Sequence, residues 1–326
     1  MKDFLKFIET LRGKDVYIQT HNFPDPDAIS SAYGLQQLLL HYDIPSVLCY
    51  EGKIDKLSTR KLTHLFDIDI RPYEELVDTM TESSPIICVD SQKHGGNILD
   101  FKGDEVACID HHPTYTPVDY EYSDVRITGS CASLIAEYYR KLGVTMSSNV
   151  ATALLYGIKM DTAQFSRGVT KLDIDMFAYL FPYIDQNTLS ALEKNTMEME
   201  DLRAYGAAIN NIELYDKTGF AMIPFACPDA MIAMVSDFIL SLEEVDISVI
   251  YSYRDNGIKF SVRSMDQKIH AGELTRIALA SVGNGGGHAS MAGGFIPKEK
   301  SQEMGDFPDS VIKQYFMDAV HKLSNS

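Results

Sequence analysis

The sequence has few basic residues, and this shortage excludes several classes of partner. It carries 29 Lys and Arg residues against 46 Asp and Glu residues, which gives a formal net charge of −17. A non-specific nucleic-acid binder needs a basic surface, and an anionic membrane repels an acidic one. We therefore expect a protein that binds neither long nucleic acids nor membranes.

Cysteines and long apolar runs are scarce as well. The five cysteines are odd in number and include no Cys-x-x-Cys pair, so neither a disulfide framework nor a zinc ribbon is predicted. The longest apolar segments, such as residues 151–158, are too short to span a bilayer. The N-terminus lacks the uninterrupted apolar stretch of a secretory signal. These features indicate a cytoplasmic protein, with enough chain for one large domain or two.

The first part of the chain alternates short apolar runs with segments of helical period. The runs lie at residues 16–18, 46–50, 85–89 and 106–109, and the helical segments between them at 28–40, 56–64 and 73–80. This alternation predicts a parallel sheet with helices on both faces.

The pattern then changes to helices at 133–142, 149–159, 173–183 and 188–214, followed by mixed strands and helices up to residue 323. Asp255-Asn256-Gly257 predicts a hairpin between strands at 247–253 and 258–263, because Asn-Gly tolerates positive φ. The predicted α/β fold has a parallel-sheet domain at 1–190, a helical linker at 191–212 and a smaller mixed α/β domain at 213–326.

Acidic and imidazole side chains follow three of the predicted strands. They are His21, Asp25 and Asp27 after the first strand, Asp90 after the third, and Asp110, His111 and His112 after the fourth; a further acid, Asp161, follows an apolar helix. In open α/β sheets, ligands gather outside the carboxyl ends of the strands. Each acid alone is typical of a helix cap or turn, but the set favours one site. Mixed carboxylate and imidazole ligation suits Mn²⁺, and less strongly Mg²⁺, Co²⁺ or Fe²⁺.

These residues, in this order, resemble the DHH phosphoesterase superfamily. The motifs are His21-x-x-Pro-Asp25-x-Asp27-Ala, Asp90, Asp110-His111-His112 and Asp161. The cluster at 283–294, which contains Gly285-Gly286-Gly287-His288, resembles the glycine motif of the DHH-associated second domain. The resemblance covers essentially the whole chain, and it implies a metal-binding catalytic domain at 1–190 and a substrate-binding domain at 213–326.

The resemblance also implies a role for each residue of the first domain. One metal ion would be held by His21, Asp25 and Asp90. A second ion would be held by Asp27, Asp90, His111 and Asp161, so that Asp90 bridges the two. Asp110 would orient a histidine without touching the metal. His112 would contact the scissile phosphate or the leaving oxygen.

In the second domain, the backbone amides of Gly285, Gly286 and Gly287 would face a substrate phosphate. His288 would add a donor, and the forked guanidinium of Arg263 would bind a phosphate. Taken without the resemblance, the glycines are equally typical of a flexible loop, and Arg263 of a solvated charge at a strand end.

The function that the resemblance implies is that of a two-metal phosphoesterase of the nano-RNase type. Its substrates would be short oligoribonucleotides or dinucleotides and the 3′-phosphate of 3′-phosphoadenosine 5′-phosphate (pAp). Three alternatives stay open. They are a phosphodiesterase of cyclic dinucleotides or linear pApA, a pyrophosphatase or exopolyphosphatase, which the cluster at 285–288 disfavours, and a nucleotide-binding regulatory protein without turnover. Assembly as a homodimer is also left open.

Overall fold

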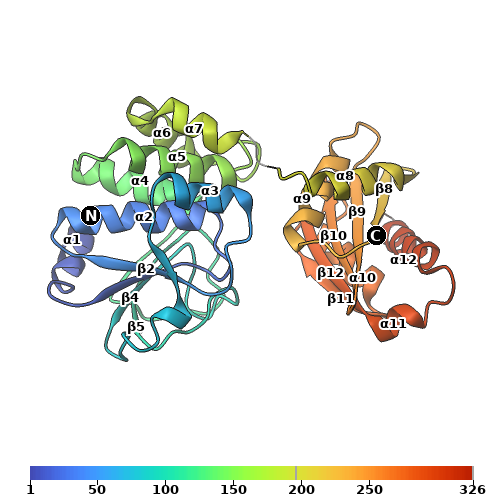
Figure 1. Ribbon diagram of the computed structural model, residues 1–326, viewed down its shortest axis with the longest axis horizontal. Helices are drawn as coiled ribbons and strands as arrows, with labels where there is room; N and C mark the ends of the chain where they lie inside the picture. Colours follow the sequence, from blue (N-terminus) through green and yellow to red (C-terminus); the bar gives the residue numbers. More distant parts are fainter. Residues whose placement is uncertain (195–196, 325–326) are drawn as a thin grey trace. The chain divides into compact units, whose positions relative to one another are not determined.

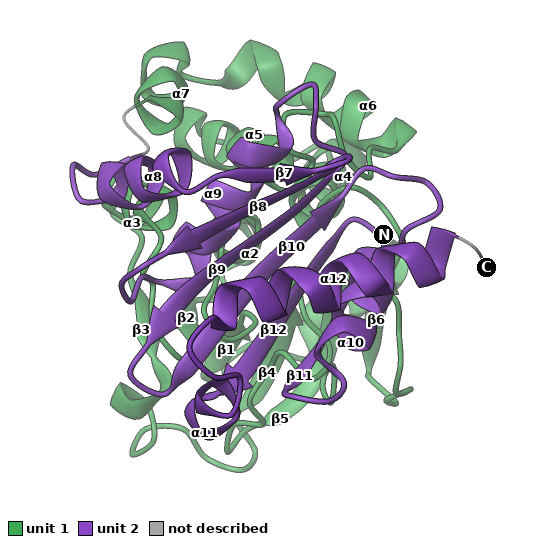
Figure 2. Ribbon diagram, turned by 90° about the vertical axis from the view of Figure 1, so that its right-hand side faces the viewer, with its two compact units in different colours: residues 1–196 green, residues 197–326 purple. Residues whose placement is uncertain are grey.

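The chain folds into two compact units, which Figures 1 and 2 show. The computed structural model describes residues 1–194 and 197–324; unit 1 spans Met1–Thr196 and unit 2 spans Met197–Ser326. The boundary falls within the predicted linker at 191–212. Residues 195–196 of that linker and 325–326 of the predicted second domain lie outside the described residues.

Unit 1 contains a six-stranded sheet in the order β3-β2-β1-β4-β5-β6, and every neighbouring pair is parallel. The strands are β1 (Val16–Gln19), β2 (Ser46–Tyr50), β3 (Ile70–Pro72), β4 (Pro85–Val89), β5 (Asp104–Asp110) and β6 (Tyr122–Val125). The chain builds outward from β1 through β2 and β3, and then returns to add β4 on the other side of β1. The strand order therefore reverses between β1 and β4, which is where open α/β sheets bind ligands.

Helices cover one face of this sheet. They are α1 (Lys2–Glu9), α2 (Pro26–His41), α3 (Leu57–Leu65), α4 (Cys131–Leu142), α5 (Ser148–Asp161), α6 (Lys171–Leu180) and α7 (Gln186–Glu193), with the 3₁₀ turn η2 (Phe181–Tyr183). The 3₁₀ turn η1 (Tyr73–Glu75) lies on the opposite face. No described helix of either unit combines the length and the hydropathy that crossing a membrane requires.

The prediction of helices on both faces of the sheet is wrong. Ile18 and Leu48 pack in one core with the helices, whereas Tyr17 and Cys49 face the opposite side and pack with Leu76. In the described residues, that second core is closed by η1, the turns after it and a loop. The predicted helix at 73–80 is reduced to one 3₁₀ turn, because a helix of this length is marginal unless packing supports it.

Unit 2 contains a mixed six-stranded sheet in the order β11-β12-β10-β9-β8-β7, in which only the β8–β9 pair is parallel. The strands are β7 (Glu213–Tyr215), β8 (Thr218–Ile223), β9 (Ile247–Arg254), β10 (Gly257–Ser264), β11 (Asn284–Gly287) and β12 (Met291–Pro297). The predicted β9–β10 hairpin is confirmed, with Arg254 opposite Gly257. The positive φ of the turn, +149°, falls on Gly257.

Both faces of this second sheet are covered. The helices are α8 (Asp201–Asn210), α9 (Asp229–Leu240), α10 (Ala271–Leu279), α11 (Lys298–Gln302) and α12 (Pro308–Ser324). Tyr251 packs with α10 and α12 on one face, and its neighbour Ile250 packs with α8 and α9 on the other. Successive side chains of a strand point to opposite faces, so one strand serves two cores.

The prediction of a single helix at 188–214 is also wrong for the residues of this range that the structure describes. Helix α7 ends at Glu193 and α8 begins at Asp201. Leu189 and Leu192 pack in the core of unit 1, whereas Ala204 and Ala208 pack in a core of unit 2. The two helices therefore belong to different units.

The glycine cluster is a β-hairpin, which excludes the flexible loop that was the alternative interpretation of these glycines. Strand β11 pairs with β12, and the hairpin closes with a hydrogen bond from the amide of His288 to the carbonyl of Met291. The amides of Ala271 and Gly272, at the start of α10, donate to the carbonyls of Ala289 and His288. A Cβ on Gly272 would lie 2.2 Å from the carbonyl oxygen of Gly287, so this contact requires glycine.

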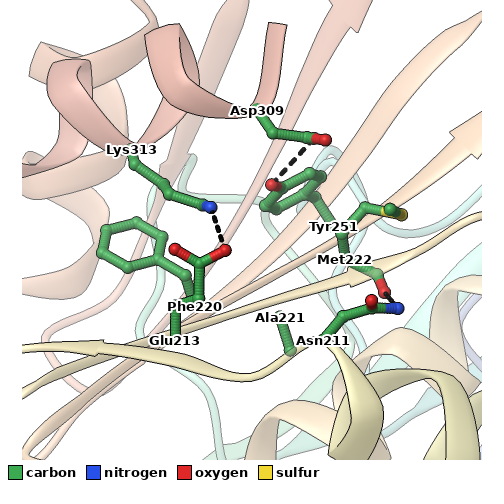
Figure 3. Close-up of a pocket in the computed structure, with 8 residues that line it drawn as sticks. All are labelled: Asn211, Glu213, Phe220, Ala221, Met222, Tyr251, Asp309 and Lys313. Carbon is green, nitrogen blue, oxygen red and sulfur yellow. Dashed lines mark hydrogen bonds and ion pairs between the residues drawn. The ribbon is translucent and has the colours of Figure 1, made fainter. Parts of the chain in front are cut away.

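A small pocket of unit 2 lies beside β8, β9 and α12 (Figure 3). Its charged groups are already paired. The hydroxyls of Tyr251 and Tyr253 both donate to Asp309 Oδ1 at 2.9 Å, and Lys313 lies 2.5 Å from Glu213. These contacts hold the first turns of α12 against the sheet.

The close approach of α10 to β11 predicts the outcome of two glycine substitutions in helices of unit 2. Gly272→Ala should destabilise the protein by about 1–3 kcal/mol, the usual cost of overpacking. Gly206→Ala in α8 is the matched control, because no atom lies within 4 Å of its Cβ position and alanine favours a helix. Scanning calorimetry of both variants measures the difference. Equal melting temperatures would contradict this account of the contact.

Candidate metal centre

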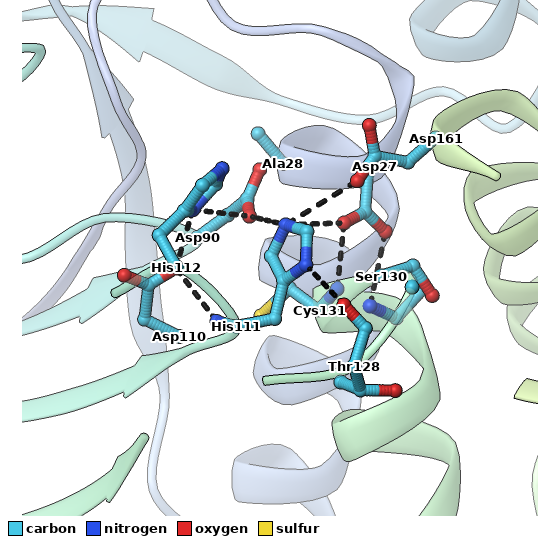
Figure 4. Close-up of polar contacts among 12 residues, drawn as sticks. Asp27, Ala28, Asp90, Asp110, His111, His112, Thr128, Ser130, Cys131 and Asp161 are labelled. Atoms are coloured by element: carbon cyan, nitrogen blue, oxygen red, sulfur yellow. Dashed lines mark hydrogen bonds and ion pairs between the residues drawn. The ribbon is translucent and has the colours of Figure 1, made fainter. Parts of the chain in front are cut away.

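Strand order brings the predicted ligands together. Strands β1, β4 and β5 are neighbours in the sheet, and the carboxyl ends of parallel strands meet at one edge. His21 follows β1, Asp90 follows β4, and His111 follows β5. Figure 4 shows His111 between Asp90 on one side and Asp27 and Asp161 on the other.

The first group consists of His21, Asp25 and Asp90. His21 Nε2 lies 3.9 Å from Asp25 Oδ1 and 3.6 Å from Asp90 Oδ2. The other ring nitrogen, Nδ1, donates to the carbonyl of Asn22 at 2.8 Å. That bond directs Nε2 toward the carboxylates, as is usual for a histidine that binds a metal.

The second group consists of Asp27, His111 and Asp161, with Asp90 at its edge. His111 Nε2 lies 3.2 Å from Asp90 Oδ1, 3.3 Å from Asp161 Oδ2 and 4.0 Å from Asp27 Oδ2. Asp90 therefore faces the first group with one carboxylate oxygen and the second group with the other.

The residues fit a pair of divalent cations. Asp90 Oδ1 and His111 Nε2 are buried and have no hydrogen-bond partner, although buried polar atoms are normally satisfied. Ligands that lie about 2.1 Å from one ion are about 3.0 Å apart at right angles and about 4.2 Å apart when opposite. The distances from each histidine nitrogen to the carboxylate oxygens of its group, from 3.2 to 4.0 Å, lie between these values.

Further contacts orient the second group. The carboxylate of Asp27 accepts hydrogen bonds from the amides of Cys131 and Ala132 at 2.7 and 3.0 Å, so it caps the N-terminus of α4. His111 Nδ1 donates to the carbonyl of Thr128 at 2.9 Å. The buried carboxylate of Asp173 accepts from the hydroxyl of Thr128 and from nearby amides, which fixes the segment that carries this carbonyl.

Asp110 and His112 form a separate pair beside Asp90. Asp110 Oδ1 accepts from His112 Nδ1 at 2.9 Å and from the amide of His111 at 2.8 Å. Its other oxygen accepts from Gln92 Nε2 at 2.7 Å. The side chain of His112 is 47 % exposed, so its remaining nitrogen, Nε2, is free to meet a substrate.

The crowding of charges shifts the pKa values strongly. Burial opposes protonation of His21 and His111, but their carboxylate neighbours outweigh it and raise their pKa values to about 9 and about 11. Burial and nearby carboxylates raise the pKa of Asp27 well above its usual value and that of Asp161 to about 6. Burial acts in the same direction on Asp25, but its contact with His21 lowers the pKa.

Backbone strain is concentrated near the ligands. Phe23 and Asp90 have φ values of 55° and 58°, in the left-handed region that residues other than glycine rarely adopt. Ala163, Gln164 and Phe165, which follow Asp161 closely, also have positive φ. Each such residue costs about 1–3 kcal/mol and persists only where its surroundings fix it, which is common at functional sites.

Two family profiles match the chain. The DHH family, N-terminal domain, matches residues 15–158, and the DHHA1 domain matches residues 217–314.

The chain belongs to the DHH superfamily of phosphoesterases.

The curated relatives of this DHH protein have several names. Uncharacterized protein MJ1633 of Methanocaldococcus jannaschii is 29 % identical over 90 % of this chain and 60 % of its own length. The cyclic-di-AMP phosphodiesterase GdpP of Geobacillus thermodenitrificans is 25 % identical over 94 % of this chain and 47 % of its own length. The probable bifunctional oligoribonuclease and PAP phosphatase NrnA of Streptococcus mutans is 24 % identical over 68 % of this chain and 70 % of its own length. The chain thus spans only about half of GdpP and 60 % of MJ1633.

Solved structures share the fold. An exopolyphosphatase-related protein from Bacteroides fragilis superposes with a TM-score of 0.76 at 20 % identity, over 99 % of this chain and 97 % of that one. RecJ from Thermus thermophilus in complex with Mn²⁺ gives a TM-score of 0.53 at 14 % identity, over 97 % of this chain and 54 % of that one. At these identities the likeness shows the fold alone.

Unit 1, which contains the DHH region, thus brings together all six residues predicted as metal ligands, with Asp110 and His112 beside them. Its profile match ends at residue 158, so Asp161 lies just beyond it. Sequence reasoning missed Gln92, Thr128 and Asp173. Gln92 follows Asp90 by two residues and could have been suspected, whereas nothing in the sequence marks the other two.

The DHHA1 domain holds the predicted substrate residues of unit 2. Arg263, on β10, pairs in register with Met291, and the amide of the next residue donates to Ser290 in the hairpin turn. The guanidinium of Arg263 is held by Asp237 at 2.6 Å and by Ser261 at 3.1 Å. His288, in the same turn, is exposed. The structure therefore places Arg263 beside the turn that carries His288.

The three glycines of the motif differ in their surroundings. A Cβ on Gly285 would lie 2.6 Å from Thr275, and one on Gly287 would lie 2.4 Å from the carbonyl of Met291. Packing within the unit thus explains both residues. Gly286 is exposed, with no atom within 4 Å of its Cβ position, so it is the residue of the three that packing leaves unexplained.

The position of Asp90 between the two groups predicts the metal content of a variant. Asp90→Asn removes the charge shared by both groups, and we expect Mn²⁺ to bind at least about tenfold more weakly. Even mutation of residues that only hold the ligands in place lowers metal affinity about 10–100-fold. Asp78→Asn, at an exposed acid of unit 1, is the matched control. Equilibrium dialysis measures the bound Mn²⁺. Unchanged affinity in Asp90→Asn would mean that the site is assigned wrongly.

The pKa values predict that metal binding releases protons. At pH 7 His21 and His111 carry protons in the metal-free protein, because their pKa values lie above 7, and ligation requires neutral imidazoles. Mn²⁺ affinity should therefore rise from pH 6 to pH 8. Calorimetric titrations in buffers of different ionisation enthalpy measure the protons released. Identical heats in all buffers would contradict the prediction.

Proposed function

We propose that this chain hydrolyses phosphate esters of short nucleotides with the help of two divalent cations. The observation that carries the proposal is the position of Asp90, whose two oxygens face two separate ligand groups. Family membership supports the reaction class. Two cations at one carboxylate suit phosphoryl transfer, in which charge develops on both the attacking and the leaving oxygen.

Each group of residues has a task in this proposal. His21, Asp25 and Asp90 would hold one ion, and Asp27, Asp90, His111 and Asp161 the other. The bound ions would supply positive charge to the phosphate and lower the pKa of a water molecule. Mn²⁺ is the preferred candidate, because carboxylate and imidazole oxygen and nitrogen donors suit it and cysteine is absent from the described ligand groups.

His112 is the candidate proton donor. Its hydrogen bond to Asp110 raises its pKa, so the ring is charged more often than a free imidazole. The same bond holds Nδ1, which leaves Nε2 as the atom that would give a proton to the leaving oxygen. Asp110 and Gln92 keep the ring in this orientation.

Unit 2 would bind the remaining charge of the substrate. Arg263 and His288 are donors, and the empty space at the Cβ position of Gly286 would admit an anion. The guanidinium of Arg263 is held on one side by Asp237, and this contact would fix its fork for a phosphate.

Short substrates fit the charge of the chain. The formal net charge of −17 repels a long polyanion over its whole length, whereas a dinucleotide needs positive charge only at its phosphates. NrnA, whose name includes oligoribonuclease and PAP phosphatase activities, supports this class. We therefore favour di- to pentanucleotides and pAp as substrates.

A second candidate is the hydrolysis of cyclic dinucleotides or linear pApA. GdpP, named as a cyclic-di-AMP phosphodiesterase, aligns with 94 % of this chain, more than NrnA does. The alignment includes both units, so the same metal centre and the same second domain would serve either substrate.

A comparison of substrates tests the proposal. With saturating Mn²⁺, the purified chain should shorten 5′-labelled di- to pentanucleotides and release phosphate from pAp, and chromatography resolves the products. Cyclic di-AMP and pApA are assayed in parallel to decide between the two candidates. Release of phosphate from pyrophosphate alone would favour a pyrophosphatase. Absence of any hydrolysis, with bound Mn²⁺ verified, would refute the proposal and leave a nucleotide-binding protein.

A further inference from the structure

Phe23 lies in the loop that carries two of the candidate metal ligands. It follows His21 by two residues and precedes Asp25 by two, so its Cα is at most about 7.6 Å from theirs. Despite this position next to buried groups, Phe23 is 63 % exposed. A large apolar ring in water at this place needs an explanation.

The backbone of Phe23 is held firmly. Its amide donates to the carbonyl of Glu51 at 2.8 Å, at the end of β2. The preceding residue, Asn22, donates its amide to the carbonyl of Asn97 and accepts from the amide of Leu99 with its side chain. These bonds maintain the left-handed φ of 55°, a conformation that is unusual for a bulky residue.

Gly52 supports one side of the ring. A Cβ on Gly52 would lie 2.7 Å from Cδ1 and Cε1 of Phe23, which leaves no room for a side chain there. Gly52 also has a φ of +89°, which glycine adopts without strain. The ring thus lies against the main chain of Gly52, while most of the side chain stays exposed.

Metal binding does not explain this arrangement. A loop that only supplied His21 and Asp25 would be served by a small polar residue in an ordinary conformation, and Phe23 is absent from the hydrophobic cores of the described chain. An exposed ring on a firmly held backbone, two residues from each of two candidate metal ligands, is suited to stack on a flat group attached to a phosphate that the metal ions would bind.

We infer that Phe23 is the platform on which a nucleobase of the substrate stacks. The inference rests on the proposed function, because it takes the substrate to be a nucleotide. Every base has a π face, so an aromatic platform binds bases with little preference among them. Phe23 would therefore select nucleotides over phosphates that carry no base.

Paired substrates test the inference. We expect Phe23→Ala to lower kcat/KM for a dinucleotide by at least about fivefold, the lower end of the range for one aromatic ring on one base. The same variant should leave kcat/KM unchanged for a dinucleotide analogue in which both bases are replaced by hydrogen. An equal fall for both substrates would mean that Phe23 only positions the metal ligands. No fall for either would also overturn the inference.

Further variants separate the ring from the loop. Phe23→Leu keeps an apolar side chain without a flat face and should behave like Phe23→Ala, whereas Phe23→Trp should keep the preference for bases. Phe307→Ala is the matched control, since Phe307 is 75 % exposed and lies in unit 2. The bound Mn²⁺ of each variant is measured to show that the ligands are intact.

A binding experiment decides the case in which the chain hydrolyses nothing. Calorimetry of the Mn²⁺-loaded protein compares adenosine 5′-monophosphate with ribose 5-phosphate, which lacks the base. The inference predicts tighter binding of the nucleotide, and a loss of at least about fivefold in Phe23→Ala for the nucleotide only. Equal affinities for both compounds would refute it, whatever the fate of the proposed function.

Discussion

Four carboxylates of unit 1 gather at one largely buried place, and their mutual repulsion is the constraint on which the rest of that unit depends. Asp25, Asp27, Asp90 and Asp161 each lie within 4.0 Å of His21 or His111, and Asp90 lies within that distance of both. Buried like charges are costly unless opposite charge or hydrogen bonds offset them. The first amides of α4 offset part of the charge of Asp27. Protonated His21 and His111 offset part of the charge of the carboxylates that they face. Two divalent cations would neutralise the remaining negative charge, which is the electrostatic reason for the proposed function.

The fold meets this constraint with rigid elements. Parallel strands bring residues 21, 90 and 111 to one edge at the reversal of strand order, and helices supply Asp27 and Asp161 from opposite ends. Outside these elements, the strained residues next to the ligands are fixed by hydrogen bonds to neighbouring segments. Under the proposed function, the acidic bulk of the chain would restrict the size of an anionic substrate, while a centre loaded with two divalent cations would attract a phosphate.

Much of this was predictable because periodicity and motif order are local properties of a sequence. The strands β1, β2, β4 and β5 and most helices follow from hydrophobic pattern, and strand-end acids indicated the site. The break between α7 and α8 was not predictable, since both halves favour a helix and only tertiary packing separates Leu192 from Ala204. The hairpin of the glycine cluster and the bond of Asp173 to Gly129, 44 residues away, likewise depend on contacts that no local pattern reports.

The cap that Asp27 places on α4 links residues 104 positions apart, and this has a consequence for biosynthesis. As the chain leaves the ribosome, the loop with His21, Asp25 and Asp27 emerges early, but its partners at Cys131 and Asp161 follow much later. Domains fold as units during synthesis, so the centre can form only after α5 has been made. Ion capture would then be a late event, because Asp161 is the last of the candidate ligands to be made.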